Sequence, residues 1–179
     1  MYKAHQVTLN DRRDLNRVQI ITEMIRLEAL AKKDKDKSAE CYYQLANSWY
    51  NMTWYGKNWL MVKQWWSRNE PDAYEVPLKQ TSFNADYYGC RQAKLYYEKA
   101  RKLTKDKKLA ALCFFMERDC QFNYRYYMQL VNKVRDIDYE NKPDYALAKR
   151  MGVDANYYRQ VVEECETYLS FIRQYNKKF

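Results

Sequence analysis

The sequence predicts an all-α protein of about seven helices, and three observations support that prediction. The chain has 179 residues but only three glycines and three prolines, too few for the turns of an all-β fold. Long stretches without either residue favour helices. In most of these stretches apolar residues recur at helical spacing. A chain of this length fits one domain, so we assign residues 1–179 to a single helical domain.

The first helix is expected to begin after a capping aspartate, Asp11 or Asp14, and to end near Lys33. Residues 1–37 then comprise a lead-in and this helix, which the segment 34–38 terminates. Its apolar stripe is wide, which indicates packing against more than one neighbour. The stripe consists of Leu15, Val18, Thr22, Ile25 and Ala29, widened by Ile21, Met24 and Leu27.

Two further helices are predicted before a long loop. The first spans residues 38–53 and the second, shorter and strongly apolar, spans 57–66. Gly56 separates them, in keeping with the preference for glycine just after a helix. Residues 67–84 contain two of the three prolines and no apolar period, so we predict a loop. Loops of this length inside a domain are often functional.

The remainder of the chain is predicted to form helices joined by short connections. A charged turn separates a helix at 84–104 from one at 106–123, and residues 124–134 either extend the latter or begin a separate helix. The acidic segment 136–140 is predicted to be a linker. The last two predicted elements are a short helix at 144–151 and a long one that Asp154 caps and that ends near Asn176.

Two of these helices carry small and aromatic residues at repeat-like spacing. In the helix at 38–53, Tyr42, Leu45, Ala46 and Trp49 follow one another at intervals of three, one and three. This spacing resembles the first helix of a tetratricopeptide repeat, in which a small residue lets a neighbouring helix approach closely. The resemblance implies a stack of helical hairpins. Its packing residues would be Tyr42, Leu45 and Ala46 in one helix and Ala93, Tyr97 and Ala100 in another.

Short segments recur within the chain. Residues 39–43 resemble residues 111–115, and residues 85–88 resemble residues 155–158. Both offsets are close to twice the tetratricopeptide period of about 34 residues. We therefore predict two divergent units with insertions, at 38–104 and 105–179; chance similarity in a tyrosine-rich chain is the alternative.

A second resemblance concerns two longer motifs. YYGCRQAKLYYEKA and KDKKLAALCFFMERDC are similar to segments of uncharacterised helical domains in larger bacterial envelope proteins. This resemblance implies a scaffold role and leaves export open. The first ten residues contain no secretory signal segment, so we predict no compartment, and a fragment of an exported envelope protein is one interpretation. No apolar run approaches the roughly 20 residues of a membrane span.

Aromatic residues are the leading candidates for partner binding. The chain contains nineteen tyrosines and five tryptophans, and all five tryptophans lie between positions 49 and 66. Tyr and Trp are enriched at interface hot spots, and their faces also stack on sugars and bases. Filling of the core is the alternative explanation. The candidate partner-binding residues are Trp49, Trp54, Tyr55, Trp59, Trp65 and Trp66.

The charge is strongly basic, with a formal net value of +9. Such a charge permits attraction to nucleic acid, anionic lipid or an acidic partner. Basic residues cluster at 32–37 and 101–108, both at predicted helix ends. We interpret these clusters as solvated turns, with a polyanion site as the alternative.

Catalytic and metal-binding patterns are sparse. The only histidine, His5, lies in the lead-in, and the five cysteines form no CxxC pair. The sequence Asp136-x-Asp138-x-Glu140 lacks the central glycine and terminal glutamate of a calcium loop. We therefore predict no catalytic residue, no metal site and no cofactor.

These features together predict a non-enzymatic protein-interaction scaffold of the tetratricopeptide-like type, with a protein or peptide partner. The alternative is an aromatic-rich module that binds a glycan or a polyanion.

Overall fold

Seven α-helices make up the described part of the chain. The structure, a computed structural model, describes residues 17–56, 79–132 and 143–176, and no strand occurs in these ranges. The predicted all-α class with about seven helices is confirmed. The helices are α1 (Arg17–Lys33), α2 (Ser38–Asn51), α3 (Ser82–Tyr87), α4 (Arg91–Leu103), α5 (Lys107–Asn132), α6 (Tyr145–Arg150) and α7 (Ala155–Asn176).

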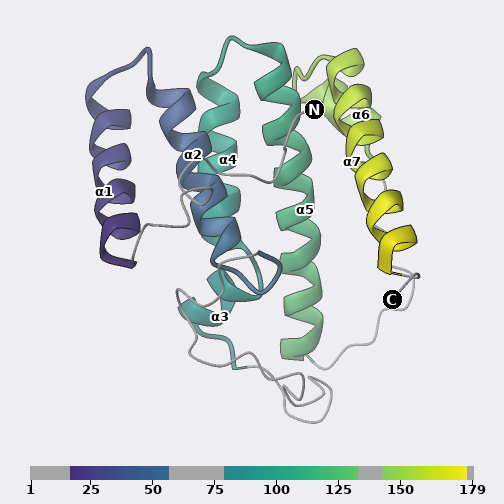
Figure 1. The fold of residues 1–179 in the computed structure, drawn as a ribbon, viewed down its shortest axis with the longest axis horizontal. Coiled ribbons are helices and arrows are strands. Elements are labelled where there is room, and N and C mark those ends of the chain that lie inside the picture. The colour runs from purple at the N-terminus through teal and green to yellow at the C-terminus, as the bar shows by residue number, and fades with distance from the viewer. Residues whose placement is uncertain (1–16, 57–78, 133–142, 177–179) are drawn as a thin grey trace.

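The five longer helices lie side by side in the order α1, α2, α4, α5, α7 (Figure 1). The short helix α3 lies at the lower end of this row and α6 near its upper end (Figure 1). Three clusters of buried apolar side chains hold the row together. Their members include Met24, Leu27 and Leu45 between α1 and α2; Ala46, Tyr97 and Met116 at the centre; and Leu112, Phe114 and Val161 on the side of α7.

Five of the six predicted repeat-packing residues lie at the contact between α2 and α4, whereas Leu45 packs in the cluster between α1 and α2. Leu45, Ala46, Ala93, Tyr97 and Ala100 are all buried. Tyr42 is half-buried and stacks on Tyr96, with ring centroids 5.9 Å apart. The small alanine side chains on both helices allow a close approach, and the tyrosine rings fill the space beside them.

Helix direction follows from contacts between side chains. Tyr42 contacts Tyr96 near the start of α2, while Trp54, just beyond its end, contacts Tyr88, so α2 and α4 are antiparallel. The turn at 104–106 makes α4 and α5 antiparallel as well. The helices α5 and α7, in contrast, run parallel, because Lys107 and Asp154 pair at the N-terminal ends of both (3.3 Å). The two arms of the predicted second unit therefore differ in direction from those of the first.

The helix predicted at 84–104 is two helices with a sharp break between them. Helix α3 ends at Tyr87, and Cys90 has a left-handed backbone (φ 53°) before α4 begins. At Gly89 a Cβ atom would lie 2.5 Å from the Ala85 carbonyl oxygen and 2.8 Å from the ring of Tyr124. Glycine is required there because the chain turns against both groups.

Other boundaries differ by small shifts or lie outside the described ranges. Helix α5 continues without interruption through residues 124–132, so the open choice between extension and restart is resolved as extension. The predicted loop at 67–84 gives way to α3 from Ser82. The predicted helix at 57–66, most of that loop and the linker at 136–140 lie outside the described residues.

Candidate interaction surfaces

The outer face of α1 exposes a row of aliphatic side chains. Val18, Ile21 and Ile25 are 73%, 44% and 64% exposed, and Thr22 and Ala29 beside them are exposed too. The expected packing of this stripe against a second neighbour is not found in the part of the chain that the structure describes. Helices that are apolar on two sides usually have neighbours on both. On its other side, α1 packs on α2 through Ile20, Met24, Leu27 and Ala31.

The predicted aromatic residues divide between packing and exposure. Trp49 is half-buried against the α1–α2 and central clusters, whereas Tyr55 is exposed. The ring of Trp54 meets those of Tyr87 and Tyr88 at 6.5 Å and 6.1 Å, edge-on and tilted respectively. Rings at such angles join α2 to α3 but do not present one flat stacking surface. The remaining candidates, Trp59, Trp65 and Trp66, lie outside the described residues.

Buried polar contacts connect α4 to both of its neighbours. The Tyr97 hydroxyl donates to Asn47 Oδ1 of α2 at 2.5 Å. Arg101 Nε donates to Glu117 Oε1 of α5 at 2.6 Å, and a second guanidinium nitrogen approaches the other carboxylate oxygen at 3.3 Å. Burial raises the pKa of the Tyr97 phenol, so the hydroxyl remains a donor at neutral pH. These contacts fix the register of α4 within the row.

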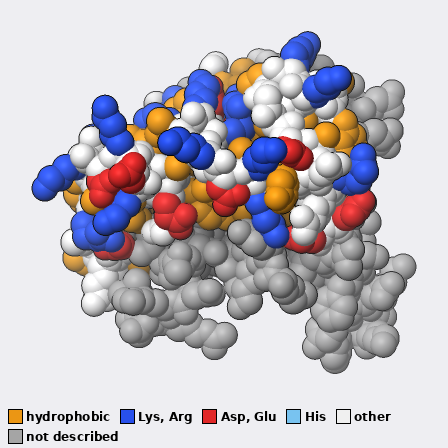
Figure 2. Space-filling model, turned by 90° about the horizontal axis from the view of Figure 1, so that it is seen from above, with side chains coloured by type: hydrophobic (Ala, Val, Ile, Leu, Met, Phe, Trp, Pro, Cys, Tyr) orange, Lys and Arg blue, Asp and Glu red, His pale blue; other side chains and the backbone are white. Residues whose placement is uncertain are grey.

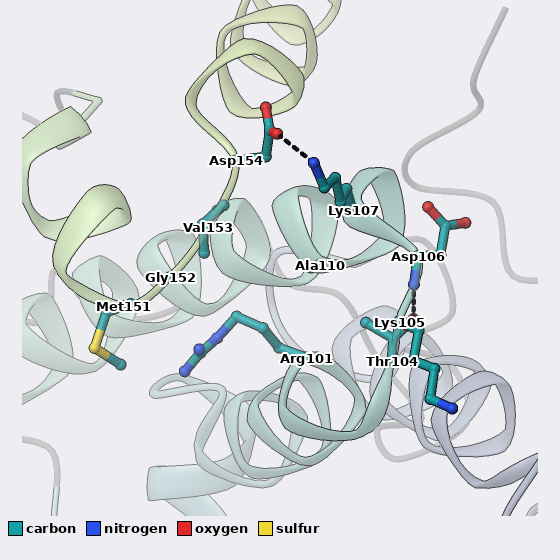
Figure 3. Close-up of a pocket in the computed structure, with 10 residues that line it drawn as sticks. All are labelled: Arg101, Thr104, Lys105, Asp106, Lys107, Ala110, Met151, Gly152, Val153 and Asp154. Atoms are coloured by element: carbon teal, nitrogen blue, oxygen red, sulfur yellow. Dashed lines mark hydrogen bonds and ion pairs between the residues drawn. The ribbon is translucent and has the colours of Figure 1, made fainter.

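A cleft of about 500 Å³ opens where the α4–α5 turn meets the loop between α6 and α7. Figure 3 shows Thr104 to Lys107 on one side of it and Met151 to Asp154 on the other, with Arg101 between them. The Lys107–Asp154 ion pair bridges the two sides. Asp106 and Asp154 each accept hydrogen bonds from backbone amides that begin α5 and α7. Two of the N-terminal amide groups of each helix are thus already partnered by a carboxylate.

No group of histidine, cysteine and carboxylate side chains in the described ranges is arranged to hold a metal ion. The single histidine, His5, lies outside those ranges, as do Asp136, Asp138 and Glu140. None of the described helices is long and apolar enough to cross a membrane.

The five cysteines are free thiols, and all are buried. Burial raises the pKa of Cys41, Cys113 and Cys120, which lowers the fraction of reactive thiolate. We therefore expect Ellman's reagent to modify the native protein at least about a hundredfold more slowly than the protein in guanidinium chloride. Release of five equivalents after unfolding is the control, and rapid reaction of any thiol in the native state would contradict the expected burial.

Comparison with known proteins found no match: no family model, curated protein or solved structure matches the chain. The class of protein is therefore defined by the fold itself: an all-α row of helices with an exposed aliphatic face at one edge.

Proposed function

We propose that the protein is a non-enzymatic interaction scaffold that binds an amphipathic helix of a partner protein along the outer face of α1. The observation that supports this proposal is the exposed aliphatic stripe of that face. Val18, Ile21 and Ile25 stand at positions i, i+3 and i+7, the spacing by which amphipathic helices recognise one another. A partner helix there would continue the row in which α1 is now the edge.

The charges beside the stripe favour a partner with acidic flanks. Arg26 and Lys32 are exposed on α1, but a glutamate of the same helix pairs with each and offsets its charge. Exposed Arg17 carries a positive charge at the start of the helix. Lys33 adds a further exposed positive charge at the C-terminal end of the helix. Acidic side chains flanking the apolar face of a partner would meet these groups, while basic ones would be repelled.

The size of the stripe sets the expected strength of binding. Full burial of an aliphatic side chain contributes about 1.5–3 kcal/mol, and these three are already partly covered. Part of that gain offsets the entropy lost on association. We therefore expect a weak, transient complex with a dissociation constant well above about 1 μM.

The test uses a synthetic amphipathic helix as the probe. A labelled peptide of about 18 residues, with leucines at i, i+3, i+4 and i+7 and glutamates on its flanks, is titrated with the protein by fluorescence anisotropy. We expect Ile25→Lys to weaken binding at least tenfold, because it places a charge in the apolar contact. Leu95→Lys, which alters an exposed leucine of α4, is the matched control and should leave binding unchanged.

Three results would overturn the proposal. The first is equal binding of a peptide with lysine flanks, and the second is equal loss in Ile25→Lys and Leu95→Lys. The third is self-association: if sedimentation velocity shows a dimer that Ile25→Lys abolishes, the face is occupied by a second copy of the chain.

A further inference from the structure

Three chain segments that are far apart in the sequence meet at one end of the row of helices. The α1–α2 connection lies at the start of α2, and Tyr42 near that start contacts Tyr96 and Lys99 near the end of α4. The α4–α5 turn therefore lies at the same end. The cleft joins this turn to the loop between α6 and α7. We call this surface, formed by residues 32–37, 102–108 and 149–154, the turn end (Figure 1).

Basic residues outnumber acidic ones in each of the three segments. Residues 32–37 contain four lysines and two aspartates, residues 102–108 contain four lysines and one aspartate, and Lys149 and Arg150 stand against one aspartate. Nearly all of these basic side chains are exposed. Figure 2 looks down on this end and shows Lys and Arg side chains spread across it rather than gathered in one groove.

Two large aliphatic side chains project from the same end. Leu103, the last residue of α4, is 52% exposed, and Met151, which follows α6, is 43% exposed. Met151 also lines the cleft (Figure 3). Exposed aliphatic tips among lysines are a combination that gains free energy at a lipid interface, where apolar groups enter the acyl boundary and cations face the head groups.

The geometry of the cleft disfavours a site for one phosphate group. Asp106 and Asp154 each place a carboxylate on two helix N-terminal amides, Lys107 is paired with Asp154, and Arg101 is bonded to Glu117. What the turn end offers is a broad field of positive charge, which suits an extended anionic surface. Nucleic acid would satisfy that field but would gain little from Leu103 and Met151.

We propose that the turn end binds the surface of an anionic phospholipid bilayer. The lysines of the three segments face the head groups, and Leu103 and Met151 enter the interface between them. The surface is distinct from the outer face of α1, so this proposal does not depend on the partner helix proposed above.

The experiment measures co-sedimentation of the whole protein with vesicles of phosphatidylcholine alone or with 30% phosphatidylserine, roughly the range in which anionic surface potentials develop. We expect binding only to the anionic vesicles, with affinity that falls as salt rises. A triple charge reversal, Lys35→Glu, Lys105→Glu and Lys149→Glu, should lower the partition coefficient by at least about a hundredfold, since each lysine contributes about a factor of five.

The matched control changes the net charge by the same amount at the opposite end. Arg17 begins α1, whose other end joins the turn end, and Arg125 lies near the C-terminal end of α5. Lys79 lies beside that same end of α5, because its backbone carbonyl accepts a hydrogen bond from Tyr127. All three are therefore remote from the turn end. The variant in which these three charges are reversed should retain most of the binding to anionic vesicles. Circular dichroism of both triple variants checks that they are folded.

A second pair of variants separates a bilayer from other anions. Leu103→Ser with Met151→Ser leaves the charge unchanged and should weaken vesicle binding about tenfold or more, because apolar burial is lost. Leu95→Ser should have no effect.

Each of the following results would overturn the proposal: equal binding to neutral vesicles, equal loss in the two triple variants, and no loss in the Leu103/Met151 variant. Displacement by millimolar inorganic phosphate would indicate a single-phosphate site instead. Tighter binding to a DNA duplex at equal phosphate concentration, unaffected by the Leu103/Met151 variant, would indicate nucleic acid.

Discussion

Replacing Glu117 by alanine is expected to lower the free energy of unfolding by about 3–5 kcal/mol. Glu117 and Arg101 are only 8% and 9% exposed, and the carboxylate meets the guanidinium through two nitrogens. Arginine does not lose its proton in proteins, so the variant leaves a buried positive charge without its carboxylate. Chemical denaturation followed by far-ultraviolet circular dichroism measures the difference.

A double variant separates the destabilisation caused by an unpaired buried charge from the contribution of the Arg101–Glu117 pair to the free energy of unfolding. Burial raises the pKa of the Glu117 carboxyl, and the bonds from Arg101 offset only part of that effect. Desolvation therefore outweighs attraction, and Arg101→Met with Glu117→Leu should restore stability to within about 1 kcal/mol of the original protein or exceed it. Two apolar side chains of similar length keep the contact between α4 and α5 filled.

The matched control for Glu117 is an ion pair on the exposed side of α4. Glu98 pairs with Lys102 one turn away at 2.6 Å, with the lysine side chain largely in solvent. Glu98→Ala should change stability by less than about 1 kcal/mol. If Glu117→Ala lowers the free energy of unfolding no more than Glu98→Ala does, water reaches the Arg101 guanidinium between α4 and α5, which would contradict the burial of the pair.

The packing residues between α2 and α4 could be predicted from the sequence because the pattern that marks them lies within each single helix. Ala46 and Ala93 lie on helices whose 3.6-residue period is plain, and small residues flanked by tyrosines indicate a close approach. The break before α4 could not be predicted in this way. It depends on the ring of Tyr124, which lies against Gly89 from a helix that begins eighteen residues later.

The two pairs of similar segments within the chain differ in whether their members occupy equivalent positions in the fold. Residues 39–43 and 111–115 both lie in the N-terminal halves of helices, α2 and α5, that run in the same direction. Residues 85–88 end α3, whereas residues 155–158 begin α7. The similar sequences at 85–88 and 155–158 therefore lie at opposite ends of their helices. Whether a helix packs parallel or antiparallel depends on tertiary contacts such as Lys107–Asp154, which no local pattern encodes.

The candidate surfaces, too, depend on tertiary packing that a local sequence pattern does not encode. The stripe of Val18 and Ile25 was predictable as a stripe, but an apolar period does not say whether a neighbour covers it. The basic clusters at 32–37 and 101–108 were visible separately, each with the ordinary explanation of a solvated turn. Only the antiparallel packing of α2 on α4 brings them to one end. The Arg101–Glu117 pair, sixteen positions apart, has no spacing by which it could be found.

Tyr97→Ala is expected to be the most destabilising apolar truncation, with a loss of about 3–5 kcal/mol. The Tyr97 ring is fully buried in the central cluster, where side chains of α2, α4 and α5 meet. Removing it opens a cavity that three helices would have to close together, and close-packed helices relax only in part. Denaturant titration gives the loss, and Tyr126→Ala, at an exposed tyrosine of α5, is the control with an expected change below about 1 kcal/mol.

Tyr97→Phe separates the hydroxyl from the ring. It keeps the volume but leaves Asn47 Oδ1, which is buried, without the hydroxyl that donates to it, so we expect a loss of about 1–3 kcal/mol. Because the ring and the hydroxyl act at one site, the phenylalanine variant should account for less than the whole alanine effect. An equal loss in both variants would mean that the hydrogen bond, rather than the filled volume, holds α4 against α2.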